Sequence, residues 1–455
     1  MEKTDEKKPR LKMSSGMPVI NPYCGGIDVG DTEHHVALPD GKGGHLVWTF
    51  GCFTEDLQAI LKLLRENGIT TVAMEATGVY YVSLFLMLEE AGIEPFLVNA
   101  RHVKNVSGRK SDDSDAIWIQ KLHACGLLQK SFQPTSEDRS LRDYVRHRKN
   151  LVNLNSDSVR RMQKALELMN LKIHTVISDI LGKTGMQIIA EILKGERDPN
   201  LLAKLRDSRI QASEEDIIKS LNGIWKPEYL FMLQQAYEDY YFHLNQIKVC
   251  EEKIREQLIK NIACIKDGDV SDVIQLTDGK KKHKKNQFDP PIKPLLIALT
   301  GIDLCAIPGV EEVTVLELIS ETGTDMSKWK TVKHFSAWLN VAPNTKATGG
   351  KIKGTKMMKK KNRAGQTLRM AASGLSRSNS SLGQYSRRMK GKLGGKGAVV
   401  ATANKLSRII YTMLRDKKEF DPNQVFQDQE KFKTIKIKQL EKQLAKLKKE
   451  VSKVA

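Results

Sequence analysis

Four acidic residues in the first part of the chain have the types and the spacing that a metal site would need. Asp28 ends one strand-like run, and Glu75 ends another. Asp112 and Asp115 stand three residues apart, so in a helix they share a face from which Asp113 is rotated away. Phosphoryl transfer with two metal ions needs several carboxylates within about 4 Å of the ions. Because Mg²⁺ prefers such hard oxygen ligands, the sequence predicts a magnesium site.

Each of these carboxylates also has an ordinary structural explanation. The acidic residues near Ser111 could serve only to cap a helix and to stabilise its dipole. Asp28 could be a turn residue, although the glycines around it also permit close approach of a ligand. Glu75 is harder to explain in this way, because an apolar strand tolerates an unpaired carboxylate poorly. Taken together, the four residues favour a functional site.

The composition indicates a polyanionic partner. The 455 residues include 74 Lys and Arg but only 54 Asp and Glu, a net charge of +20. Such an excess supplies the sequence-independent part of nucleic-acid affinity, although a basic protein attracted to anionic lipid has the same composition. With an aromatic content of 6%, base stacking is not expected to dominate binding.

Nothing in the sequence predicts a membrane-spanning segment or an exported protein. No apolar run approaches the roughly 20 residues that span a bilayer, and the charged N-terminus lacks a signal core. The six cysteines include no Cys-x-x-Cys pair, which argues against a zinc site or a disulfide framework. We therefore expect no membrane association and a cytoplasmic location.

Residues 21–130 alternate between strand and helix patterns. An antiparallel meander followed by βαβ units predicts a mixed sheet with helices on its faces, hence an α/β domain. The expected strands are 27–29, 35–38, 46–50, 71–74 and 95–98, and the expected helices cover 57–64 and 79–90.

The rest of the chain is predicted to be mainly helical. Its apolar spacing indicates a long helical or coiled-coil middle region and, near the end, a heptad seam at Ile437, Leu440, Leu444, Leu447, Val451 and Val454. The expected parts are a disordered 1–20, the α/β domain at 21–130, a helical linker and dimerisation region at 131–262, a basic loop or insertion at 263–295, a C-terminal domain at 296–418 and a heptad tail at 419–455.

The motifs around the acidic residues resemble those of a known family. Gly26-Ile-Asp28-Val-Gly30, Glu75-Ala-Thr-Gly78 and Lys110-Ser-Asp112-x-x-Asp115-Ala116 are similar to the D-E-D-D signature of a transposase family of bacterial insertion sequences, related to the Piv-type DNA invertases. The resemblance implies a RuvC-like (RNase H-like) catalytic domain. It also implies that Asp28, Glu75, Asp112 and Asp115 bind Mg²⁺, as two ions for which Mn²⁺ can substitute.

The same resemblance implies partners. These are double-stranded donor and target DNA, a structured guide (bridge) RNA that pairs with both, and further copies of the chain in a homodimer or homotetramer. A location at the bacterial nucleoid follows from such partners.

The C-terminal domain resembles the second domain of that family. The likeness is carried by residues 335–343, 348–351, 363–369 and 396–414. In addition, Ile307-Pro-Gly309-Val310 resembles the turn of a helix-hairpin-helix, whose N–H groups can bind a phosphate, although Pro is also common at an ordinary helix start.

The family's nucleophile is a serine, and the matching position here is Thr348. A threonine hydroxyl can attack a phosphodiester, but its β-methyl crowds the approach. Three possibilities stay open: Thr348 acts, a nearby Ser373, Ser376 or Ser381 acts, or the chain is impaired. The basic residues expected to bind nucleic acid, unless they only form a solvated loop, are Lys110, Lys351, Lys353, Lys356, Lys359, Lys360, Lys361 and Arg363.

The sequence therefore predicts a transposase that cuts and exchanges DNA strands through a covalent protein–DNA intermediate. One alternative is a metal-dependent nuclease or Holliday-junction resolvase that activates water and needs no Thr348. The other is a nucleic-acid-binding protein without catalysis.

Overall fold

The computed structural model describes residues 18–42, 44–99, 112–265, 287–349, 351–359 and 362–422, together with positions 434, 437, 440, 441, 443 and 444. Within 112–114, 344–347, 352, 355 and 356 only the backbone is described. The chain divides into an N-terminal unit, 1–133, and a C-terminal unit, 134–455. Each unit is described by itself.

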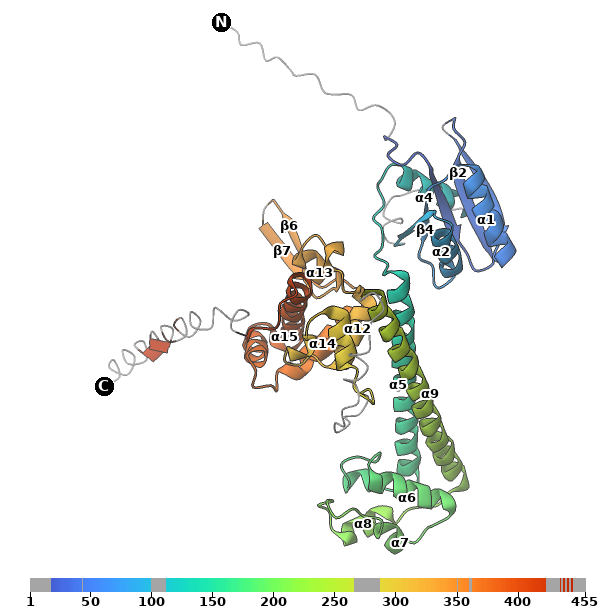
Figure 1. The fold of residues 1–455 in the computed structure, drawn as a ribbon. Helices are drawn as coiled ribbons and strands as arrows, with labels where there is room; N and C mark the ends of the chain where they lie inside the picture. The colour runs from blue at the N-terminus through green and yellow to red at the C-terminus, as the bar shows by residue number, and fades with distance from the viewer. Residues whose placement is uncertain are drawn as a thin grey trace. The chain divides into compact units, whose positions relative to one another are not determined.

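A five-stranded mixed sheet forms the centre of the N-terminal unit (Figure 1). Its order is β3-β2-β1-β4-β5. The first three strands pair antiparallel, whereas β4 is parallel to both β1 and β5. This confirms the five strands and the mixed sheet predicted from the sequence. Their bounds are β1 Cys24–Val29, β2 Glu33–Pro39, β3 His45–Gly51, β4 Thr71–Glu75 and β5 Glu94–Val98.

Helices cover both faces of this sheet. On one face, α1 (Thr54–Glu66) and α2 (Tyr81–Glu90) share a core with strand residues such as Ile27 and Met74. On the other face, α4 (Asp112–Ala124) packs against Ala73, Val98 and their neighbours. Side chains of a strand alternate between faces, so these two clusters show which residues face α4. The mixed sheet with helices on both faces confirms the predicted α/β class.

Two long helices, α5 (Ser136–Leu168) and α9 (Pro227–Ile265), run side by side in the C-terminal unit (Figure 1). Arg148 pairs with Glu251, and Arg161 pairs with Asp239. As residue numbers rise on α5 they fall on α9, so the pair is antiparallel. The predicted helical region is confirmed, and within one chain its two helices form a hairpin.

A small helical bundle joins the far ends of α5 and α9. Its core contains Ile188, Leu202 and Ile217, all fully buried. The apolar spacing of residues 131–262 predicts helix throughout and does not distinguish this bundle. It consists of η1 (Ile173–Thr175), α6 (Lys183–Lys194), α7 (Pro199–Ala203) and α8 (Glu214–Leu221).

The last part of the C-terminal unit is helical, as predicted, except for an unpredicted β-hairpin. Asn344 pairs with Lys356 at its open end, and Thr348 pairs with Lys351 at the turn. The elements are α11 Lys293–Thr300, η2 Leu304–Ala306, α12 Glu312–Thr322, η3 Met326–Lys328, α13 Val332–Trp338, β6 Asn344–Thr348, β7 Lys351–Lys356, α14 Arg363–Leu375 and α15 Ser381–Asp416.

Several predictions fall outside the described residues. These are the predicted disorder of 1–17, most of the basic loop and half of the heptad seam. The described seam positions Ile437, Leu440 and Leu444 are helical and more than half exposed. Over the part of the chain that the structure describes, no helix is both long and apolar enough to span a membrane.

Candidate active site and nucleic-acid surface

Asp28 and Glu75 lie at the carboxyl ends of two neighbouring parallel strands. Ile27 pairs with Met74 in the β1–β4 ladder, so Asp28 and Glu75 are the next residues on the two strands. Their side chains point away from the fully buried Ile27 and Met74, and therefore toward the face that α4 covers. Neighbouring strands are about 4.8 Å apart, which brings the two half-buried carboxylates to one edge of the sheet.

Gly26 allows α4 to approach this part of the sheet very closely. A Cβ at Gly26 would lie 2.4 Å from the backbone nitrogen of Gln120 and 2.5 Å from the carbonyl oxygen of Ala116. Such distances leave no room for any side chain. Gly26 and Asp28 are two positions apart and face the same way, so α4 is docked directly beside Asp28.

The direction of α4 carries its first turn to the same edge. Its last residue, Ala124, accepts a hydrogen bond of 2.7 Å from the N–H of Ile20, ahead of β1. Gln120 and Ala116 come next along β1, at Gly26. The helix therefore runs opposite to β1, and Asp115, which is half-buried, lies at the end where β1 reaches Asp28. Position 112 is one turn before Ala116 on the same helical stripe.

Polar contacts fix α4 in this place. The amide oxygen of the buried Gln120 accepts a hydrogen bond from His45 Nε2 at 2.8 Å, and its amide nitrogen donates to the carbonyl of Cys24 at 3.3 Å. One turn further on in α4, His123 Nε2 lies 3.0 Å from the Thr71 hydroxyl. Burial lowers the pKa of His123, so a neutral ring fills this position. These contacts tie α4 to β1, β3 and β4.

The donor chemistry of this edge fits a hard divalent cation. Asp28, Glu75 and Asp115 offer only carboxylate oxygens, which suit Mg²⁺. The side chain of Asp112 lies outside the described residues. Among the residues that are described, no three His, Cys, Asp or Glu side chains are grouped closely enough to hold a metal ion. The four-carboxylate site therefore stays a prediction. The structure does bring together β1, β4 and α4, the elements that carry the four residues.

The sequence interpretation missed a histidine beside Asp28. His35 on β2 is the register partner of Asp28 in the β1–β2 ladder, so both side chains lie on the α4 face. Its Nδ1 lies 3.3 Å from the Thr49 hydroxyl, and its Nε2 lies 3.5 Å from a carboxylate oxygen of Glu33. The tight turn between the two predicted strands was a signal that could have set this pairing.

Thr348 is exposed at the turn of the β6–β7 hairpin. Gly349 directly follows β6 and has a φ of 57°, a left-handed value that suits a tight hairpin turn. The Thr348 hydroxyl is thus presented at the tip of a protruding element. Two of the alternative nucleophiles are engaged within α14 or just after it, since Ser373 donates to the carbonyl of Met370 and Ser376 to that of Ser373.

Half of the predicted nucleic-acid-binding residues can be described. Lys351, Lys353, Lys359 and Arg363 are exposed on the hairpin and at the start of α14. Lys110, Lys360 and Lys361, and the side chain of Lys356, lie outside the described residues.

The predicted phosphate-binding turn precedes α12. Gly309 has a φ of 81° there, as a tight turn requires. However, Glu311 and Glu312 begin the helix, and Glu312 accepts a hydrogen bond of 2.8 Å from the N–H of Ile292. Phosphate binding at this turn stays a prediction, and the negative charges of the two carboxylates would oppose it.

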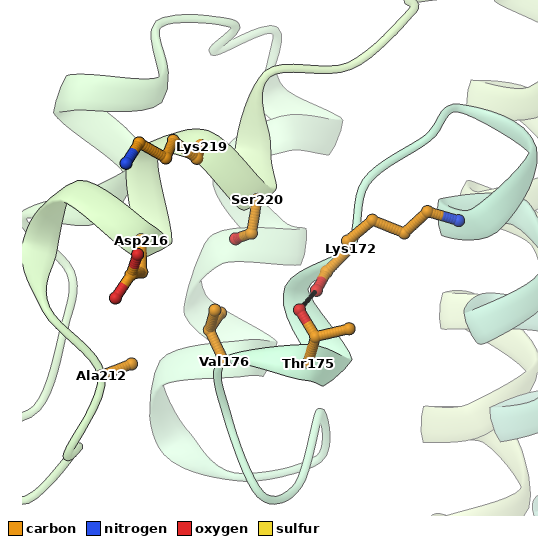
Figure 2. Close-up of a pocket in the computed structure, with 7 residues that line it drawn as sticks. All are labelled: Lys172, Thr175, Val176, Ala212, Asp216, Lys219 and Ser220. Carbon is orange, nitrogen blue, oxygen red and sulfur yellow. Dashed lines mark hydrogen bonds between the residues drawn. The ribbon is translucent and has the colours of Figure 1, made fainter.

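A surface pocket of about 660 Å³ lies in the small bundle, between η1 and α8 (Figure 2). The Thr175 hydroxyl donates to the carbonyl of Lys172 on its wall, at 2.7 Å. Lys172 and Lys219 share the lining with Asp216, so the pocket has no strong charge of either sign. We assign no chemistry to it.

Comparison with known families decides the identity of the chain. A model of the DEDD transposases of IS110 elements, described as "Transposase", matches residues 25–171. A second, described as "Transposase IS116/IS110/IS902 family", matches residues 303–387. Together the two cover about half of the chain. The chain belongs to the IS110 transposase family. The resemblance predicted from the sequence motifs is therefore confirmed, and the first match includes Asp28, Glu75, Asp112 and Asp115.

Solved structures similar to this transposase include two of RuvC from Thermus thermophilus. RuvC in complex with a Holliday junction substrate is 16% identical, over 24% of this chain and 98% of that chain, with a TM-score of 0.20. A second structure of Thermus thermophilus RuvC is 17% identical, over 24% of this chain and 99% of that chain, with a TM-score of 0.19. Likeness at this level carries no functional conclusion. No curated protein matched the chain.

Proposed function

We propose that this IS110-family transposase cuts and rejoins DNA strands with Mg²⁺ held by Asp28, Glu75, Asp112 and Asp115. Family membership already implies a DNA transposase or recombinase. The observation that carries the metal-dependent mechanism is the shared edge of β1 and β4. There Asp28 and Glu75 are neighbours, and the close contact at Gly26 docks α4 with its first turn at the same level.

The carboxylates have a defined task in this mechanism. Bound Mg²⁺ would neutralise charge on the scissile phosphate and stabilise the oxygens that attack and leave. Two of the carboxylates stand on a sheet and two on a docked helix, so their spacing depends on the packing of α4 rather than on a loop. Rigid supports of this kind keep metal ligands in place before the substrate binds.

The Thr348 hydroxyl is the proposed nucleophile. Its oxygen forms a bond to phosphorus, its proton passes to solvent or a neighbouring base, and the deoxyribose oxygen leaves with the bonding electron pair. The protein–DNA phosphodiester formed in this way keeps the energy of the broken bond for rejoining. Exposure of Thr348 at the hairpin turn supports the proposal, because a protruding hydroxyl can reach a phosphate on a duplex.

The proposal includes partners. A structured guide RNA would choose donor and target DNA, and strand exchange would pass through a Holliday-type junction in a homodimer or homotetramer. The net charge of +20 supports binding of both polyanions.

The test is to trap the covalent adduct from purified protein, co-purified RNA, donor and target DNA and Mg²⁺, and to locate it by mass spectrometry. We expect an adduct at Thr348 that is lost in Asp28→Asn, Glu75→Gln and Thr348→Ala. Asp31→Asn is the matched control, because Asp31 is an exposed carboxylate three residues from Asp28. It should behave as the unchanged protein.

Other outcomes would overturn parts of the proposal. An adduct at Ser373, Ser376 or Ser381 would move the nucleophile. Cleavage that survives Thr348→Ala without any adduct would assign the attack to water, as in a nuclease or junction resolvase. Equal activity of Asp28→Asn and Asp31→Asn would contradict the proposed role of Asp28 in binding Mg²⁺.

A further inference from the structure

A long stretch of the C-terminal unit contains no acidic residue. Between Asp325 and Asp416 the sequence has 21 Lys and Arg and not one Asp or Glu. The solvated helix α9, by contrast, carries four Lys and Arg and six Asp and Glu within its 39 residues. A basic face that serves only for solubility is expected to mix both signs, as α9 does. The acid-free stretch therefore indicates a surface adapted to a polyanion.

Part of this charge is concentrated in the middle of α15. Arg387, Lys390, Lys392 and Lys396 are all exposed, and Arg388 adds a fifth cation. All five cations lie within the ten residues from 387 to 396. Each strand of a DNA duplex carries one phosphate per ~3.4 Å of axis. The segment thus carries enough positive charge to contact several neighbouring phosphates.

The local structure presents these side chains to a partner. Gly394 breaks the helix, with φ 71° and ψ 176°. At Gly391, Gly394 and Gly395 an added Cβ would meet nothing within 4 Å, so no other described part of the chain covers the kink. A backbone that bare allows close approach of a phosphate strand.

One of the cations is held in position. The Arg387 Nη1 group donates to the carbonyls of Ser376 and Ser378, at 3.0 and 2.7 Å, which fixes the guanidinium at the end of α14. Arg377, also exposed, lies in the same turn of chain. An ordered arginine loses less side-chain entropy on binding than a free one.

We propose that the kinked segment 387–397 of α15 is a second nucleic-acid contact, which binds the phosphate backbone of duplex DNA without reading its sequence. It rests on the proposed function for the choice of DNA as the polyanion. It is separate from the hairpin residues around Thr348, and it lies almost wholly beyond the family match that ends at residue 387. Its role is to hold the duplex while the hairpin reaches the scissile phosphate.

The test compares two triple variants of the full-length protein. Lys390→Ala, Lys392→Ala and Lys396→Ala remove three charges from the segment. Lys204→Ala, Lys226→Ala and Lys248→Ala remove three equally exposed charges from the small bundle and α9. Lysine and alanine have similar helix propensities, so neither triple should unfold a helix. Binding to a 30-base-pair duplex of arbitrary sequence is measured against salt concentration.

The expected result is a change in the salt dependence. Each neutralised phosphate contributes about 0.9 to the slope of log affinity against log salt, so the α15 triple should lower the slope by about 2–3 and the control triple should not. Equal slopes for the two triples would overturn the proposal. A loss confined to a hairpin RNA of the same length would assign the surface to RNA instead.

The outcome can be separated from the test of the proposed function. Asp28→Asn should lose cleavage while it keeps the full salt slope, and the α15 triple should need a higher DNA concentration for half-maximal cleavage. If the unchanged protein does not cleave DNA, the proposed function fails. The salt dependence of duplex binding still decides whether segment 387–397 binds a duplex.

Discussion

At the scale of single residues, Gly26 has more influence on the candidate site than its lack of a side chain suggests. The backbone of α4 occupies the place where its Cβ would be. We predict that Gly26→Ala pushes α4 off the sheet. Overpacking of this kind costs about 1–3 kcal/mol of unfolding free energy, and more when the obstacle is backbone, as here. Urea unfolding should show the loss, and calorimetry should show weaker Mg²⁺ binding.

Gly25→Ala is the matched control for this change. It lies on the same strand but on the opposite face, where the added Cβ would meet the Cδ2 of Leu38 at 3.0 Å, the far end of a flexible side chain. We expect a smaller loss of stability and unchanged Mg²⁺ binding. Similar effects of the two variants on Mg²⁺ binding would mean that the docking of α4 does not position the carboxylates.

The same residues show how far sequence could predict the candidate site. Asp28 and Glu75 could be placed together because both end predicted neighbouring strands, and parallel strands end at one edge. Gln120 and Gly26 could not be paired, because a helix–strand contact between distant segments depends on how closely the two backbones approach. Sequence periodicity gives the face of a helix but not that distance.

At the scale of elements, the buried ion pair between α5 and α9 sets the register of their hairpin. Arg148 lies 2.5 Å from a carboxylate oxygen of Glu251, and both side chains are about nine-tenths buried. Burial raises the pKa of Glu251, although Arg148 opposes that shift. We predict that Arg148→Met costs about 3–5 kcal/mol of unfolding free energy, because the buried carboxylate of Glu251 loses the partner that donates two hydrogen bonds to it.

The double variant tests the origin of this cost. Arg148→Met combined with Glu251→Leu replaces the pair by apolar side chains of similar size, and should recover most of the lost stability. Thermal unfolding of the two single variants and the double variant gives the coupling energy. A double variant as unstable as the sum of the single ones would mean that the pair does not act as a unit.

Elements with a clear apolar period were predicted, and the β6–β7 hairpin was not. Strands 71–74 and 95–98 stood out as apolar runs between turns. The hairpin sequence from Asn344 to Lys356 is rich in Lys, Thr and Gly and lacks the alternation of apolar and polar residues that predicts a strand. Its signal is the Gly349-Gly350 pair, which favours a two-residue hairpin turn but also belongs to the motif that resembles the nucleophile motif of the family.

At the scale of the whole molecule, the exposed seam of the tail predicts self-association. Ile437, Leu440 and Leu444 follow heptad spacing on a helix and are 55%, 52% and 57% exposed in the single chain. A second copy would bury them. We predict that Leu444→Lys shifts the protein toward monomer in light scattering. Gln443→Lys adds the same charge one position off the seam and should leave the mass unchanged; a monomeric wild type would contradict the prediction.

Self-association also decides how the two halves of the proposed centre meet. The carboxylates belong to the N-terminal unit and Thr348 to the C-terminal unit. If the centre forms between subunits, a chain with Asp28→Ala still supplies a working Thr348, and a chain with Thr348→Ala still supplies working carboxylates. One of the two centres in a mixed dimer is then complete, and the other lacks both parts. We therefore predict that the two inactive variants restore adduct formation when they are co-expressed.

The chain to which the DNA is attached provides a second test of this prediction. With a different tag on each variant, the DNA should be attached only to the Asp28→Ala chain, because that chain alone retains the hydroxyl. A centre formed within one chain would leave every mixed dimer inactive, since each chain would lack one essential part. Native mass spectrometry should first show that homodimers and mixed dimers are both present. Absence of an adduct on either chain would then assign the carboxylates and the nucleophile of each centre to a single subunit.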